Sequence, residues 1–154
     1  YLGGDADPET PRRVDIADMA ASLADAAADA GRDVTYDGPD HLELDIRASS
    51  IRRAIGNLVD NAIQYGSAVV VRVEEDADSV TIAVEDDGPG VPDDALERVT
   101  EPFVRLDPSR PRDTPGFGLG LAIVRRAARN EGGWLVLTNR ATGGFRAAII
   151  LPRG

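Results

Sequence analysis

The sequence predicts an α+β fold, a two-layer sandwich in which a mixed, mostly antiparallel sheet of about five strands packs against three helices. Three segments carry apolar residues at helical spacing, and the short segments between them alternate apolar and polar residues. Because one face of each element is apolar, helices and sheet are expected to bury these faces against each other.

The first helix is predicted over residues 15–30, with Asp15 as its cap and Gly31 as its stop. The second is predicted at about residues 49–65, where the apolar stripe consists of Ile51, Ile55, Leu58, Val59 and Ala62. The third is predicted over residues 119–131 and ends at Gly132 and Gly133.

Short extended segments are expected at residues 34–36 and 42–46. Residues 69–73 and 80–84 alternate apolar and polar side chains across an Asp-rich turn, so they are predicted to form an antiparallel hairpin. Residues 134–138 and 144–151 are expected to complete the sheet, with Trp134 packed into it.

Length and composition favour one compact domain with a leading connector. The chain has 154 residues, of which 42% are hydrophobic, enough for one sizeable core. Residues 1–13 combine two glycines and two prolines with acidic residues, which predicts a linker followed by a domain over residues 14–154. From 86 to 118, Gly, Pro, Asp and Arg dominate around a short predicted helix at 93–99, and such a long irregular stretch is usually functional.

Charge and residue usage exclude several classes of partner. A net charge of -10 argues against a general nucleic-acid or anionic-membrane binder. The chain has no cysteine and a single histidine, His41, which excludes disulfides and a thiolate zinc site. No apolar run approaches the roughly 20 residues that span a bilayer, so we expect no direct membrane insertion.

Polar side chains gather on one side of the second predicted helix, opposite its apolar stripe. Within RRAIGNLVDNAIQYG, residues 52–66, these are Asn57, Asp60, Asn61 and Gln64. Asparagine oxygens are suitable ligands for Mg²⁺ that also binds nucleotide phosphates. The alternative is an ordinary solvated helix face.

The run VEDDGPGVP, residues 84–92, places Asp86 at the end of an apolar strand, followed by Gly88 and Gly90. Glycine permits close approach of the backbone to a flat ligand, and the carboxylate is suited to accept a hydrogen bond from an exocyclic amino group such as that of adenine. The alternative is an Asp-Gly turn without a ligand.

A glycine-rich segment, GFGLGLAIV at residues 116–124, precedes and opens the third predicted helix. Its Gly116, Gly118 and Gly120 leave free backbone N–H groups at a positive helix end, which favours phosphate. The segment lacks the preceding strand and GxGxxG spacing of dinucleotide folds. Taken alone, a glycine-rich start of a helix is more often structural.

These three segments, together with EPFVRLD at 101–107, occur in the order and spacing of one known family. The chain resembles the catalytic and ATP-binding domain of sensor histidine kinases, of the osmosensor type, within the superfamily that includes gyrase, Hsp90 and MutL. The resemblance covers about residues 14–152 and implies the Bergerat ATP-binding fold. The segments correspond to the N, G1, F and G2 boxes of the family.

The resemblance implies a role for each matching position. It makes Asn57 and Asn61 catalytic residues and magnesium ligands, with Asn61 the main ligand, and it makes Arg105 catalytic. Tyr65 is expected beside adenine and Asp86 on its amino group. The other expected nucleotide-binding residues are Gly88 and Gly90 in the adenine pocket, Phe103 in the F box, Arg105 and Arg110 in an ATP lid over residues 91–115, and Gly116, Gly118, Leu119 and Gly120 in the G2 box.

The implied function is transfer of the γ-phosphoryl group of Mg-ATP to a histidine on a separate helical dimerisation domain of the same protein. A response regulator is the further expected partner, and the expected location is the cytoplasm, with a membrane-anchored sensor as one form of the parent protein. His41 lacks the acidic residue, basic residue and proline that follow a phosphoacceptor histidine, so a surface role is expected for it.

Two other functions remain as alternatives. An ATP hydrolase of the same superfamily commonly has a glutamate one helical turn before the magnesium-binding asparagine, where this chain has Asn57. A noncatalytic nucleotide-binding or interaction module is favoured by Gln64 and Phe117, which replace a basic and a small residue of many family members. Retention of Asn61 and Asp86 argues against that third function.

Overall fold

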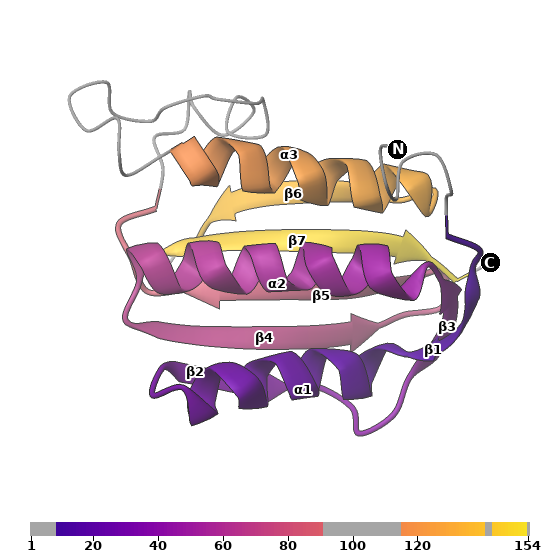
Figure 1. Cartoon of the computed structure of the whole chain (residues 1–154), viewed down its shortest axis with the longest axis horizontal. Coiled ribbons are helices and arrows are strands. Elements are labelled where there is room, and N and C mark those ends of the chain that lie inside the picture. Colours follow the sequence, from indigo (N-terminus) through magenta and orange to yellow (C-terminus); the bar gives the residue numbers. More distant parts are fainter. Residues whose placement is uncertain (1–8, 91–114, 141–142, 154) are drawn as a thin grey trace.

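The computed structural model describes residues 9–90, 115–140 and 143–153. They form a five-stranded sheet covered on one face by helices (Figure 1). The strand order is β2-β4-β5-β7-β6, with β2 at Asp33–Asp37, β4 at Ala68–Glu75, β5 at Ser79–Asp86, β7 at Phe145–Pro152 and β6 at Trp134–Asn139. Among these five strands, only β2 and β4 pair in parallel. The predicted α+β class with a mixed, mostly antiparallel sheet is confirmed.

The described segments contain three helices, α1 (Ile16–Asp29), α2 (Ala48–Tyr65) and α3 (Pro115–Asn130), which lie side by side over the sheet (Figure 1). Helix α1 begins as predicted, because the Asp15 carboxylate accepts the N–H of Asp18, and it ends before Gly31, whose φ is 91°.

The predicted start of α3 at residue 119 was wrong, since the helix begins at Pro115. A proline is well suited to the first helical position, where its fixed φ is already helical and no N–H is needed. Gly116 and Gly118 therefore lie in the first turn of the helix and do not precede it.

Alternation along the strands sets which side chains meet the helices. Val69, Val71 and Val73 of β4 and Val80, Ile82 and Val84 of β5 are buried, together with the apolar stripe of α2. Asp86 continues the same alternation by two residues, so its side chain belongs to the helix-covered face. The core thus directs one carboxylate inward at the end of β5.

A second, two-stranded sheet joins β1 (Arg12–Asp15) to β3 (Glu43–Ile46) in antiparallel register. The first two residues of β1 come from the segment predicted as a linker, and the division into linker and domain stays a prediction. Upstream of β1, the Glu9 carboxylate accepts the N–H groups of Ser49 and Ser50. It therefore supplies the N-terminal cap of α2, whose own capping residue makes no such bond.

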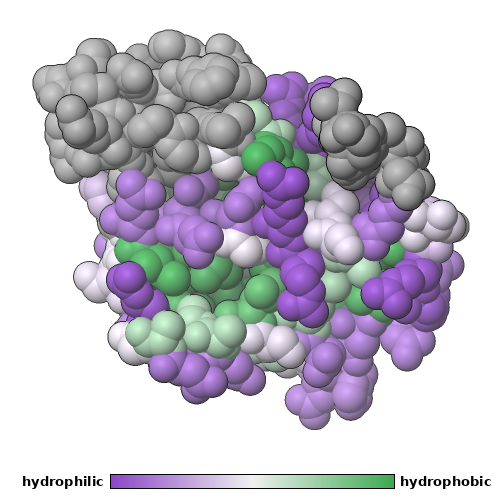
Figure 2. Space-filling view, in the orientation of Figure 1, coloured by the Kyte–Doolittle hydropathy of each residue, from purple (hydrophilic) through white to green (hydrophobic). Residues whose placement is uncertain are grey.

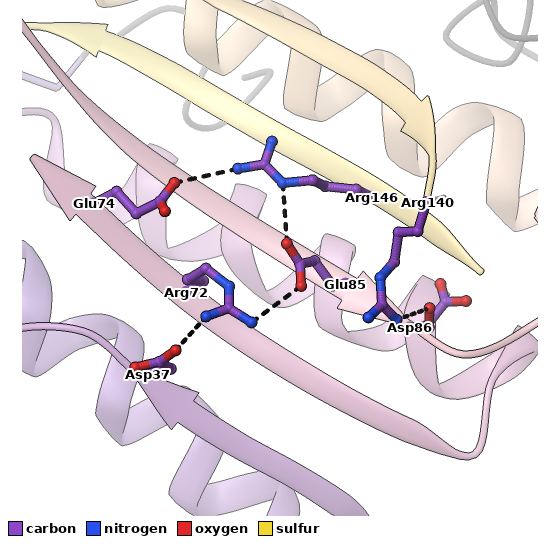
Figure 3. A network of polar contacts seen from close by, with 7 residues as sticks. All are labelled: Asp37, Arg72, Glu74, Glu85, Asp86, Arg140 and Arg146. Atoms are coloured by element: carbon purple, nitrogen blue, oxygen red, sulfur yellow. Dashed lines mark hydrogen bonds and ion pairs between the residues drawn. The ribbon is translucent and has the colours of Figure 1, made fainter. Parts of the chain in front are cut away.

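The face of the sheet away from the helices carries a row of ion pairs (Figure 3). Glu85 of β5 lies between Arg72, at 3.2 Å, and Arg146, at 3.0 Å, and these cations also pair with Asp37 and Glu74. The network bridges β2, β4, β5 and β7, which makes this side of the sheet polar over its centre.

Trp134 was predicted to pack into the sheet, and this was wrong: 53% of its surface is exposed. Trp134 begins the edge strand β6 and lies opposite Ile150, on the face away from the helices, whereas Leu135 packs against the core. An edge position with no covering helix leaves the indole in solvent.

No helix of the described part of the chain is both long and apolar enough to cross a membrane.

Candidate functional site

The end of β5, the last turn of α2 and the first turns of α3 lie at one edge of the molecule (Figure 1). For β5 and α2, the connectivity of the chain explains why their ends lie together. Only Gly66 and Ser67 separate α2 from β4, and β4 is antiparallel to β5, with Val69 opposite Asp86. The end of α2 must therefore lie beside the end of β5.

Asp86 is a buried carboxylate with accepting capacity to spare. Its side chain is 4% exposed, and its Oδ1 accepts the N–H of Gly88 at 2.8 Å. Burial raises its pKa, against the lowering effect of the Gly88 hydrogen bond. Arg140 donates from Nη1 to the backbone oxygen of Asp86 at 2.9 Å (Figure 3). The backbone N–H of Phe145 also lowers this pKa through a hydrogen bond to the carboxylate. Because a carboxylate has about four acceptor sites, accepting capacity remains for a donor from outside the chain.

Asn61 faces α3 across a gap kept open by a glycine. A Cβ added to Gly120 would lie 3.5 Å from Nδ2 and 3.8 Å from Oδ1 of Asn61. The Nδ2 atom is buried and has no hydrogen-bond partner among the described residues. Since buried polar atoms are nearly always paired in native proteins, this amide is suited to an external ligand.

The polar side of α2 faces two neighbours. Asn57, one turn before Asn61, is partly buried, while Asp60 and Gln64 line a groove of about 550 Å³ between α1 and α2. Figure 2 shows hydrophobic side chains gathered between these two helices, and the groove residues of this kind are Ala27, Ala30 and Ile63. The groove lies on the other side of α2 from Gly120, so it is separate from the site.

Asp87 holds the turn between α2 and β4 against the end of β5. Its Oδ1 accepts the N–H of Ser67 at 2.6 Å and that of Ala68 at 2.9 Å. These two bonds lower its pKa, the Ala68 bond most. A Cβ on Gly66 would lie 2.8 Å from Cβ of Asp86, so glycine permits this close approach.

Sequence reasoning missed Asp87, Gly66 and Arg140. An acidic residue directly after a strand often accepts nearby backbone N–H groups, which was the available signal for Asp87. Arg140 is 54 residues from Asp86 along the chain, and no local pattern connects them.

The remaining predicted residues fall into two groups. Tyr65 is the last residue of α2, Gly88 and Gly90 follow β5 with φ of 76° at Gly90, and the others in described segments, Gly116, Gly118 and Leu119, belong to the first turns of α3. The predicted lid at 91–115, except Pro115, lies outside the described residues, as do the helix at 93–99, Phe103, Arg105 and Arg110.

Metal binding by acidic or imidazole clusters finds no support in the described segments, where no group of three or more His, Cys, Asp or Glu residues has a suitable arrangement. The two predicted ligands on α2, Asn57 and Asn61, are neutral amides. A cation there would take most of its ligands from water or from a bound anion.

Comparison with known proteins identifies the family. The model described as histidine kinase-, DNA gyrase B- and HSP90-like ATPase matches residues 46–154. The chain belongs to this family. Within it, the chain is 44% identical over 104 residues to the sensor histidine kinase GtrS of Pseudomonas aeruginosa, covering 68% of this chain and 21% of GtrS. The chain thus spans about a fifth of the length of that curated relative.

Solved structures of family members have the same fold. The ATP binding domain of PrrB from Mycobacterium tuberculosis is 28% identical, with a TM-score of 0.78, and the match covers 95% of this chain and 99% of that one. The histidine kinase domain of the E. coli osmosensor EnvZ is 32% identical, with a TM-score of 0.72, covering 96% and 92%. The resemblance to histidine kinases of the osmosensor type is confirmed.

Proposed function

We propose that the chain is the catalytic domain that binds Mg-ATP in a sensor histidine kinase and delivers the γ-phosphoryl group to a histidine on a separate helical domain of the same protein. One observation supports it most: a buried carboxylate and a buried amide nitrogen without a partner lie on elements that meet at one edge, in a family of ATPases. Both groups can still bind a ligand.

Asp86 is proposed to recognise adenine. Its buried carboxylate offers an acceptor to the amino group of the base, and the absence of side chains at Gly88 and Gly90 leaves backbone beside the ring. Arg140 contacts the backbone oxygen of Asp86, and the N–H groups of Gly88 and Phe145 use only part of the accepting capacity of its carboxylate. Tyr65, at the end of α2, is proposed to lie beside the same base.

Asn61, with Asn57 one turn earlier, is proposed to hold magnesium through side-chain oxygens. The unpartnered Nδ2 of Asn61 is compatible with this role, because rotation of the amide by half a turn exchanges the positions of its oxygen and nitrogen. A bound magnesium ion supplies charge neutralisation at the phosphates. Gly120 keeps the adjacent face of α3 free of side chains, and backbone N–H groups of Gly116 and Gly118 are proposed to bind phosphate oxygens.

Phosphoryl transfer to histidine requires little acid–base catalysis by this domain. A neutral imidazole attacks with its own lone pair, forms the N–P bond as the bond to ADP breaks, and needs no proton removed beforehand. Positioning and charge stabilisation are then the main tasks of the protein. Asn57 fits this requirement, since an amide is not a base, whereas hydrolysis of ATP benefits from one.

The proposal extends to residues and partners outside the described structure. Phe103, Arg105 and Arg110, in the proposed lid over 91–115, are assigned to the nucleotide by the family resemblance, with both arginines on the phosphates. The proposed partners are the histidine-bearing dimerisation domain and a response regulator, and the proposed location is the cytoplasm. These partners belong to the whole protein, of which this chain is proposed to be a part.

Transfer of radiolabelled phosphate from γ-labelled ATP tests the proposal. The chain alone should remain unlabelled, because His41 is exposed and paired with Asp15 at 2.8 Å without a phosphoacceptor context. Addition of the histidine-bearing helical domain of the parent protein should give an acid-labile label on that domain. Strong label on His41, or rapid release of free phosphate without label transfer, would contradict a histidine kinase.

A further inference from the structure

The proposed site is divided between two elements that no regular secondary structure joins. Asp86 lies on β5 and Asn61 on α2, and a base-binding group and a phosphate-binding group must keep a fixed separation to hold one nucleotide. The two-residue turn between α2 and β4 is the nearest covalent link from the end of α2 into the sheet. Its geometry therefore sets how α2 sits over the end of β5.

The turn is held by hydrogen bonds to the side chain of Asp87, the residue directly after β5. Oδ1 of Asp87 accepts two backbone N–H groups, that of Ser67 in the turn at 2.6 Å and that of Ala68, the first residue of β4, at 2.9 Å. Oδ1 also lies 3.0 Å from where a Cβ of Gly66 would stand. One carboxylate oxygen thus bonds to two successive residues of the connection, and it would crowd any side chain at the residue before them.

Asp86 and Asp87 are neighbours with different surroundings. The Asp86 side chain is buried on the helix-covered face, whereas Asp87 is exposed and its carboxylate points to the turn. Since the two residues share one peptide unit, a turn fixed to Asp87 is also fixed relative to Asp86. The same bonds therefore place the last turn of α2 against the adenine-binding carboxylate.

We propose that Asp87 is a positioning residue that fixes the Asn61 side of the site relative to Asp86 through its two hydrogen bonds to the α2–β4 turn. The inference rests on the proposed nucleotide site and assigns Asp87 no contact with nucleotide or metal. It requires an acceptor oxygen at this position and not a negative charge. The asparagine variant keeps that oxygen, and the alanine variant loses it.

Calorimetric titration of the full chain with ATP, with magnesium and with a chelator, tests the inference. The informative quantity is the magnesium factor, the ratio of the Kd without magnesium to the Kd with it. In Asp87→Ala this factor should fall about tenfold, because α2 is released and Asn61 shifts while Asp86 stays on β5. Asp87→Asn should keep the factor within about twofold of the unmutated value.

Asp76 offers a matched control. Its carboxylate also accepts two backbone N–H groups, from Asp78 and Ser79, but in the turn at the far end of β4, roughly 25 Å away. Asp76→Ala therefore removes the same kind of interaction without touching α2 and should leave the magnesium factor unchanged. A general loss of stability would instead weaken binding equally with and without magnesium in both alanine variants.

Amide hydrogen exchange supplies a second measurement that does not depend on nucleotide. Ser67 and Ala68 should exchange faster in Asp87→Ser, which shortens the side chain by one bond, and at the unmutated rate in Asp87→Asn. If Asp87→Ala does not fold, Asp87→Ser takes its place in this test. An unchanged magnesium factor in Asp87→Ala, or equal loss in Asp87→Asn, would overturn the inference alone. No magnesium-dependent binding in the unmutated chain would overturn the proposed function with it.

Discussion

At Asp86, one buried carboxylate is proposed to select the base. Adenine presents a donor amino group where guanine presents a carbonyl, so the ionised acid attracts the first and repels the second. A buried acceptor facing another acceptor costs about 1–3 kcal/mol, roughly tenfold to a hundredfold in affinity. ATP should therefore bind more tightly than GTP. In Asp86→Asn the amide NH₂ can face guanine, so the preference should shrink, and an unchanged ratio in calorimetry would remove Asp86 from the base site.

The same residue should cost the unliganded domain stability. Burial raises the pKa of Asp86 above its usual value, so the folded domain holds the proton of this carboxyl more tightly than the unfolded chain does. Its contribution to stability is then full below the ordinary pKa of an aspartate and is lost as the pH rises through the raised value. Asp86→Asn should unfold at a higher temperature than the unmutated domain at pH 7. Below pH 4 the difference should shrink, and a variant less stable at pH 7 would contradict this account.

Residue-level prediction from sequence succeeded where a residue's neighbours in the chain define its surroundings. Asp86 follows three alternating apolar residues and precedes a glycine turn, and both features are local. Arg140 and Gly66 act on Asp86 through tertiary contacts and escaped notice. Trp134 was misplaced because hydrophobicity predicts burial only where another element covers the strand, and β6 has a free edge and an uncovered face.

Among the helices, Gly56 of α2 and Gly120 of α3 lie beyond the first turn but in different surroundings. Gly120 of α3 faces Asn61, whereas a Cβ at Gly56 of α2 would meet nothing within 4 Å. Replacing either by alanine should stabilise its helix by about 0.5–1 kcal/mol. Gly120→Ala should also weaken Mg-ATP binding about tenfold or more, because its methyl group takes up space beside the Asn61 amide.

Gly56→Ala is the matched control for that experiment. It should give the same gain in thermal stability and leave the Kd for Mg-ATP unchanged, since its methyl group enters open space. Denaturant unfolding and calorimetry on both variants separate helix propensity from site geometry. Equal affinities in the two variants would show that the face of α3 beside Asn61 does not contact the ligand.

Element boundaries were predictable where a cap or an interrupted pattern marks them. Asp15 and Gly31 delimit α1 as expected, and the apolar stripe of α2 gave its length to within one residue. Helix α3 begins four residues before its predicted start. The prediction placed Gly116 and Gly118 before the helix, whereas Pro115 occupies its first position. The cap that Glu9 places on α2 comes from 40 residues upstream, beyond the reach of any local pattern.

At the scale of the whole molecule, the predicted class followed from alternation and periodicity, whereas the strand order did not. The central strand β5 pairs with β7 across 58 or more residues, through register that depends on which apolar faces meet. The result is a sheet with a helix-covered apolar face and an outer face braced by the Glu85 ion pairs. This rigid layer carries Asp86 at one edge, beside the ends of α2 and α3.

Binding of Mg-ATP where α2, β5 and α3 meet can be tested by NMR chemical-shift mapping. The isotope-labelled chain would be titrated with magnesium and a non-hydrolysable ATP analogue. The largest shifts are expected at the side-chain amides of Asn57 and Asn61 and the backbone amides of Asp86, Gly88 and Gly120. The amides of Asp78 and Ser79, in the turn at the other end of β4 and β5, should remain nearly unchanged. No shifts at millimolar nucleotide, or shifts centred on the groove between α1 and α2, would contradict it.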